Sequence, residues 1–152
     1  MSLSPASSSG SSGGGTGVVG SGSRSTDLAT AATTFGTGSD VLASPISFTA
    51  NGTASYAALL IGPGMTNNFA GGGKQNTLAL VLDGAQSTVI VFAGPAATSQ
   101  PLPLAGMSLI ATPAAGVHTV NVRFWVNGGT GTLFGSGSLN PSNILLYVLQ
   151  LA

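Results

Sequence analysis

Residues 118–126 read His-Thr-Val-Asn-Val-Arg-Phe-Trp-Val, and this stretch decides the fold. Val120, Val122, Phe124 and Val126 alternate with Thr, Asn, Arg and Trp, which is the period of a β-strand whose successive side chains point to opposite faces. The stretch ends at Asn-Gly-Gly, residues that accept a positive φ. It therefore predicts a long strand with one face in a hydrophobic core.

The chain carries almost no charge. Charged residues make up 4% of its 152 residues, against roughly 25% in an average soluble protein, and the formal net charge is zero. Copies with such a surface repel one another weakly, so a free monomer should associate. We expect the chain to belong to an assembly that covers much of its surface.

The composition also argues against a nucleic acid partner, a membrane partner and disulfide bonds. The three bases, Arg24, Lys74 and Arg123, are scattered, whereas phosphate binding needs clustered cations, so we expect no nucleic acid partner. The longest apolar runs, 56–61 and 144–149, are far shorter than the roughly 20 residues of a membrane-spanning helix, so we expect no membrane partner. No secretory signal is visible at the N-terminus. Cysteine is absent, which excludes a disulfide framework.

Residues 1–27 are rich in Gly and Ser and offer little to bury. Such composition is typical of a flexible or extended segment. We predict an extended N-terminal arm over residues 1–27, followed by one domain over residues 28–152. Val18 and Val19, an apolar pair among glycines, and Arg24 are the candidate contacts of the arm with a neighbouring protein. The alternative is a disordered tail.

From residue 28 onward, short β-prone runs alternate with turn residues. Asn51-Gly52 and Asp83-Gly84 predict tight turns, and Gly62-Pro63-Gly64 is expected to end a strand. No stretch has capped helical periodicity, so we predict an all-β sandwich or jelly roll of about eight or nine strands. The strands are expected at residues 32–35, 46–50, 56–61, 77–82, 88–92, 104–111, 118–126, 130–134 and 143–151.

The last predicted strand is apolar on both faces, since Ile144, Leu146 and Val148 alternate with further apolar residues. A sandwich strand needs only one apolar face, so the second face needs a cover, and a symmetric partner is the simplest one. A loop of the same chain is the alternative. The candidate interface residues are Tyr147, Leu149 and Leu151, together with Trp125.

The sequence offers little catalytic chemistry. The acids Asp27, Asp40 and Asp83 lie apart, and His118 is the single imidazole, so no three-His or His/Cys metal site is possible. Residues 10–14 match Gly-x-Ser-x-Gly but lack the flanking strand and helix, and residues 71–75 lack the spacing of a phosphate loop. We therefore expect no catalytic residue, no metal, no cofactor and no enzymatic activity.

Three stretches resemble the closing strands of C1q/TNF-like jelly rolls: Gly116-Val-His-Thr-Val-Asn-Val-Arg-Phe124, residues 128–133 and residues 146–151. Residues 46–52 followed by 56–61 are similar to the opening strands of that group. The resemblance implies a jelly roll and a homotrimer whose axis is packed by apolar and aromatic side chains. Such domains occur widely in virion proteins of tailed phages.

The resemblance implies a trimeric capsid decoration (cement) protein on the capsid surface of a virion. Its arm would bind the major capsid protein or another virion protein. The alternative is a tail-fibre or head-fibre receptor-binding module, in which loops 62–75 and 94–103 would contact a host glycan. We favour decoration because heptads for a coiled-coil stalk are absent, and because these loops offer Asn67, Asn68 and Phe69 but no Trp or Tyr.

Overall fold

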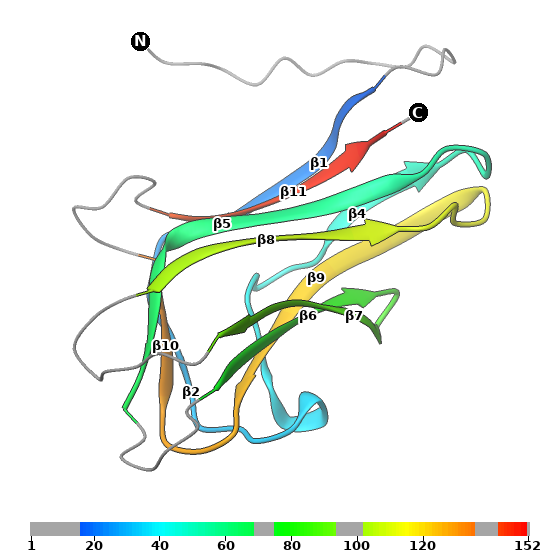
Figure 1. Cartoon of the computed structure of the whole chain (residues 1–152). Helices are drawn as coiled ribbons and strands as arrows, with labels where there is room; N and C mark the ends of the chain where they lie inside the picture. The colour runs from blue at the N-terminus through cyan, green and yellow to red at the C-terminus, as the bar shows by residue number, and fades with distance from the viewer. Residues whose placement is uncertain (1–15, 69–74, 94–101, 136–142, 152) are drawn as a thin grey trace, which may run out of the picture.

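The computed structural model describes residues 16–68, 75–93, 102–135 and 143–151, and shows two antiparallel β-sheets packed face to face (Figure 1). Sheet A contains β1 (Gly17–Arg24), β2 (Leu28–Thr30), β5 (Tyr56–Asn67), β8 (Leu102–Ile110), β10 (Gly131–Phe134) and β11 (Ile144–Gln150). Sheet B contains β3 (Ser39–Asp40), β4 (Ile46–Ala50), β6 (Asn76–Leu82), β7 (Ala85–Ala93) and β9 (Gly116–Val126). A 3₁₀ turn, η1 (Phe35–Thr37), precedes β3.

The strand order is that of a jelly roll. The body of sheet A has the order β1-β11-β5-β8, and the body of sheet B has the order β4-β9-β6-β7. Apart from the β6–β7 hairpin, each strand of the body is followed by one in the opposite sheet. The short strands β2 and β10 extend sheet A beside the end of β5, and β3 extends sheet B beside the end of β9. The predicted all-β jelly roll is thus confirmed.

Strand β9 holds the centre of sheet B, as its alternation predicted. Val120, Val122, Phe124 and Val126 are completely buried. They face the inward side chains of β5 and β11, among them Leu60 and the apolar row Ile144, Leu146 and Val148. The two inner faces together form one hydrophobic core.

Two strand predictions are wrong in detail. The strand beginning at Tyr56 does not end at Gly62-Pro63-Gly64 but continues to Asn67. The register against β8 shifts between Gly62 and Met65, so Pro63 sits in an irregularity where the sheet needs no N–H donor. Residues 32–35 are not a strand, because the chain turns at η1 and the Phe35 ring packs edge-on against Trp125, 5.7 Å between centroids.

The boundary of the predicted arm is also wrong. Residues 17–24 form β1, which pairs with β11 of the same chain. Glycine is needed here because β1 packs closely on sheet B: a Cβ at Gly20 would lie 2.5 Å from Ile46 Cγ2, and one at Gly22 2.6 Å from Leu42 Cδ1. The Gly/Ser composition therefore reflects close sheet packing at β1, while residues 1–15 lie outside the part of the chain that the structure describes.

Candidate functional site: the outer face of sheet A

Four strands of sheet A present apolar side chains away from the core. Residues directly opposite each other in antiparallel strands point to the same face, so the registers define three rows across β1, β11, β5 and β8. We call the apolar members of these rows the outer apolar face. It consists of Val18, Leu145, Tyr147, Leu149, Ala57, Leu59, Ile61, Ala105, Met107 and Leu109.

Several of these side chains are open to solvent. The exposed fractions of Met107, Leu109 and Val18 are 67%, 61% and 60%, while Tyr147 and Leu149 are half-buried. The three rows contain no charged residue, only Ser21 and Ser23 of β1 as polar members. The solvated face of an antiparallel sheet is normally polar, and a large contiguous apolar patch marks an interaction surface. The outer apolar face is therefore the candidate functional site.

The predicted interface residues divide between two surfaces. Tyr147 and Leu149 lie on the outer apolar face, and Leu151 follows just beyond β11, where its N–H donates to Ser55 O at 2.9 Å. Trp125 does not join them, because it lies on β9 of sheet B and packs against Phe35. The alternation of β9 placed Trp125 opposite the core but could not tell which outer face that would be.

The three residues predicted to contact a shell protein lie in different surroundings. Val18 lies opposite Leu149 and extends the outer apolar face, and Val19 occupies the irregularity of β1 next to it. Arg24 is engaged within the chain: its guanidinium donates to the carbonyl oxygens of Thr26 and Asp27, 2.9 and 3.3 Å away, and to that of Val41. These contacts fix the turn after β1.

Sequence reasoning missed the contribution of β5 and β8. Leu59 and Ile61 were visible as part of a strand that is apolar on both faces, but their neighbours were not known. Met107 and Leu109 of β8 point outward, and Ser108 between them points into the core. The signal that could have found the face is the occurrence of two doubly apolar strands, 56–61 and 144–151, since such strands tend to lie side by side in one sheet.

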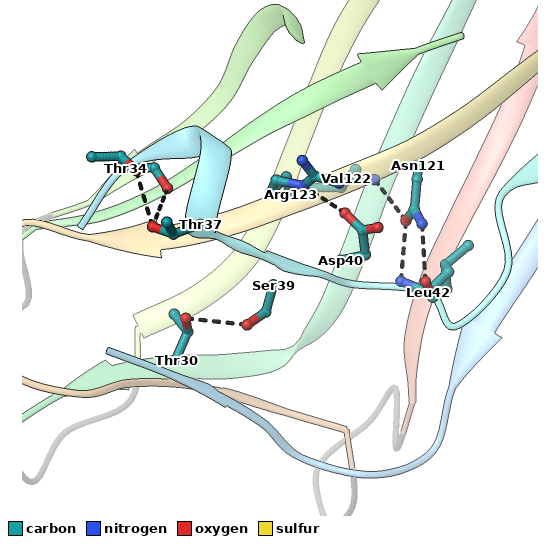
Figure 2. A network of polar contacts seen from close by, with 9 residues as sticks. All are labelled: Thr30, Thr34, Thr37, Ser39, Asp40, Leu42, Asn121, Val122 and Arg123. Carbon is teal, nitrogen blue, oxygen red and sulfur yellow. Dashed lines mark hydrogen bonds and ion pairs between the residues drawn. The ribbon is translucent and has the colours of Figure 1, made fainter. Parts of the chain in front are cut away.

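The outer face of sheet B has a different character, because the segment before β4 runs along β9 and supplies polar partners to it (Figure 2). Asp40 Oδ1 accepts a hydrogen bond from Arg123 Nε at 2.7 Å, and this ion pair raises the pKa of Arg123. The Arg123 guanidinium also lies 5.0 Å from the centroid of the Phe35 ring. These groups form a polar layer in which the Arg123 and Asp40 charges are paired with each other.

A buried amide completes this layer. Asn121 Oδ1 accepts from the N–H groups of Leu42 and Val122, at 3.1 and 2.8 Å, and Asn121 Nδ2 donates to Leu42 O at 2.9 Å (Figure 2). The side chain thereby replaces the ladder bonds that are missing between β3 and β4, where the chain leaves the sheet. Its role is to hold the segment 41–45 in place.

The part of the chain that the structure describes contains no group of three or more His, Cys, Asp or Glu side chains able to hold a metal ion. Within the same residues no helix is long and apolar enough to cross a membrane. The Asp40–Arg123 and Asp83–His118 pairs lie at separate places on β9, so they do not form one site.

Neither a protein-family model nor a curated protein matches this sequence. Among solved structures, a family 35 carbohydrate-binding module from an environmental isolate is similar in fold, with a TM-score of 0.35 and 12% sequence identity. The alignment covers 90% of this chain and 93% of that one. A likeness at this level says nothing of what this chain binds.

Proposed function

We propose that this chain is a non-enzymatic structural protein of a virion, a homotrimeric capsid decoration protein whose subunits pack through the outer apolar face. The observation that carries the proposal is the exposure of Met107, Leu109 and Val18 on an uncharged sheet surface. Such a surface is unfavourable in water, and burial of apolar area stabilises by roughly 25 cal/mol per Å².

The partner that best fits the outer apolar face is a second copy of the chain. The outer apolar face spans all four body strands of sheet A and lacks charges that would need a matched partner. A face without charge can pack against another copy without burying an unpaired charge, which suits a homo-oligomer. The resemblance of the sequence to C1q/TNF-like jelly rolls favours a trimer over other symmetries.

Sedimentation velocity and native mass spectrometry of the full chain test the assembly. We expect a homotrimer at micromolar concentration. Met107→Asp combined with Leu109→Asp should yield a folded monomer, because both side chains are exposed in the single chain and each new charge would be buried in the interface.

The matched control is Val117→Asp. Val117 is 72% exposed but belongs to β9, where it pairs with Thr49 of sheet B. This variant should remain trimeric. A wild-type protein that stays monomeric, or a Val117→Asp variant that dissociates as fully as the double variant, would refute the use of the outer apolar face.

The virion role needs a separate measurement. Tryptic peptides of the chain should be recovered from gradient-purified virus particles of its source, in constant ratio to the major shell protein. A ratio near one trimer per lattice position supports decoration of the capsid. A few trimers per particle would support the alternative, a fibre or tail receptor-binding module, and absence from the particles would refute both.

Attachment to the shell is proposed for the residues that precede β1. Deletion of residues 2–15 leaves all strands of sheet A in place, since β1 begins at Gly17. The shortened protein should form trimers and lose attachment to the particles, measured by co-sedimentation. Undiminished attachment would assign the contact with the shell to the domain itself.

A further inference from the structure

The only histidine of the chain sits between two hydrogen-bond acceptors. His118 Nδ1 lies 2.7 Å from Asp83 Oδ2, and His118 Nε2 lies 2.9 Å from Ala114 O. A carboxylate oxygen and a carbonyl oxygen both accept hydrogen bonds and cannot donate them. Both ring nitrogens can therefore be satisfied only when the imidazole carries two protons and a positive charge.

The contacts of His118 join the turn of the β6–β7 hairpin, which is distant in the sequence, to the β8–β9 turn, which directly precedes β9. Asp83 forms the turn of the β6–β7 hairpin at φ 50°, and Ala114 lies in the turn between β8 and β9. Asp83 also binds β9 directly, because its Oδ1 accepts from Thr119 N at 2.8 Å and its N–H donates to Thr119 O at 2.9 Å. Loss of one His118 contact would loosen the link between the two turns.

The surroundings leave Asp83 as the one charged group that contacts His118 among the described residues. From β4 the imidazole meets the Phe48 ring at 5.7 Å, and Phe48 in turn packs on Tyr56 of β5 at 5.0 Å. The β8–β9 turn, residues 111–115, contains no ionisable side chain. The His118 side chain is 15% exposed, so water can take up the proton that it loses.

We propose that His118 is a proton-operated latch, which holds the β8–β9 turn against the β6–β7 hairpin and releases it when the imidazole becomes neutral. The latch lies at the end of the sandwich where β1 begins and β11 ends (Figure 1). The inference rests on the geometry of this cluster and does not depend on the proposed assembly.

The direction of the pH dependence follows from the partners. The hydrogen bonds to Asp83 and Ala114 raise the pKa of His118 above its ordinary value, and the bond from His118 lowers the pKa of Asp83. The stabilisation by His118 is thus complete below about pH 6.5 and is lost as the pH rises through the raised value. The contribution of Asp83 is lost only in acid, as the pH falls through its lowered value.

The first test uses the full-length wild-type protein. Because the chain has a single histidine, its imidazole proton signals in an NMR titration between about pH 5 and 9 belong to His118 alone. We expect its titration midpoint above the ordinary value, and a melting temperature that falls by a few degrees across the same range. A midpoint at or below the ordinary value would overturn the proposal even if no variant could be made.

Asp83→Asn separates the latch from other titrating groups, such as the terminal amine. Asn tolerates the positive φ of this turn, and its amide can donate to Nδ1 of a neutral imidazole, which then donates from Nε2 to Ala114 O. The variant should titrate at a lower pH than the wild type and show a melting temperature nearly independent of pH above 6.5.

Asp40→Asn is the matched control, because it removes a carboxylate whose partner is Arg123 and leaves the His118 cluster intact. This control should keep the fall of the melting temperature with pH. The proposal is wrong if Asp83→Asn keeps the same fall as the wild type and Asp40→Asn.

Discussion

At the scale of single residues, Asn121 and Gly20 determine how closely neighbouring segments can pack. Asn121 supplies both a donor and acceptors to Leu42 and Val122, so it behaves like a short piece of neighbouring strand. Gly20 has no side chain where Ile46 needs room. No pattern in the sequence marks either residue, and substitution at either position should cost stability.

Asn121→Asp should destabilise the fold by roughly 3 kcal/mol at neutral pH, because a carboxylate cannot donate to Leu42 O and would be buried facing it. Burial raises the pKa of the new carboxyl, so the loss should shrink as the pH falls towards 4 and it becomes protonated. Urea unfolding at matched protein concentration, followed by Trp fluorescence, measures this difference.

Asn51→Asp is the control for that substitution. Asn51 is exposed, and its Oδ1 accepts from Thr53 N and Ala54 N, at 2.9 and 2.8 Å, which a carboxylate can also do. The free energy of unfolding should change little. An equal loss in both variants would contradict the role assigned to Asn121.

Gly20→Ala should cost roughly 1–3 kcal/mol, since the new methyl would lie 2.5 Å from Ile46 Cγ2 and sheets A and B would have to separate locally. Gly17→Ala is the matched control in the same strand, because nothing lies within 4 Å of a Cβ there. Both variants lose the same freedom in the unfolded chain. Thermal unfolding that ranks the two alike would contradict close packing at β1.

At the scale of elements, β1 shows where prediction from sequence failed. Gly and Ser have low strand propensity, so the composition of residues 17–24 predicts part of an arm and not a strand. The pairing with β11 supplies seven of these residues with ladder partners, and the inward glycines let Leu42 and Ile46 approach. Propensity alone could not reveal this, because the need for glycine comes from sheet B.

Other elements were predictable for a physical reason. The period-two alternation predicts strand β9, and the residues Asp83-Gly84 predict the turn that they form. Apolar residues on both faces predict strands β5 and β11. The outer apolar face was predicted only at Tyr147 and Leu149. Met107, Leu109 and Val18 belong to the face because β8 pairs with β5 and β1 pairs with β11. No local sequence pattern encodes these long-range pairings.

A deletion series tests the assignment of β1 to the domain. Removal of residues 2–15 should leave the melting temperature unchanged, whereas removal of residues 2–24 should lower it by many degrees, because the edge of β11 and the side chains of Leu42 and Ile46 would lose their cover. Equal melting temperatures for both deletions would show that β1 contributes nothing to stability.

At the scale of the whole molecule, the outer apolar face and the scarcity of charge belong together. A subunit contact without ion pairs is not weakened by electrolyte, so the proposed trimer should persist in 1 M NaCl, where the Debye length is only about 3 Å. Sulfate should strengthen it, since it favours apolar burial. Dissociation in NaCl, followed by sedimentation velocity, would show that charged groups hold the copies together.

The position of β11 between β1 and β5 has a consequence for the order in which the protein can form. During synthesis, sheet A remains two separate pieces until β11, the last strand along the chain, has emerged. Gly17 then pairs with Gln150, so the ladder that closes the sheet joins residues from opposite ends of the domain. Because such long-range pairings form slowly, the nascent chain spends this interval with an open strand edge, and its yield should depend on how quickly synthesis is completed.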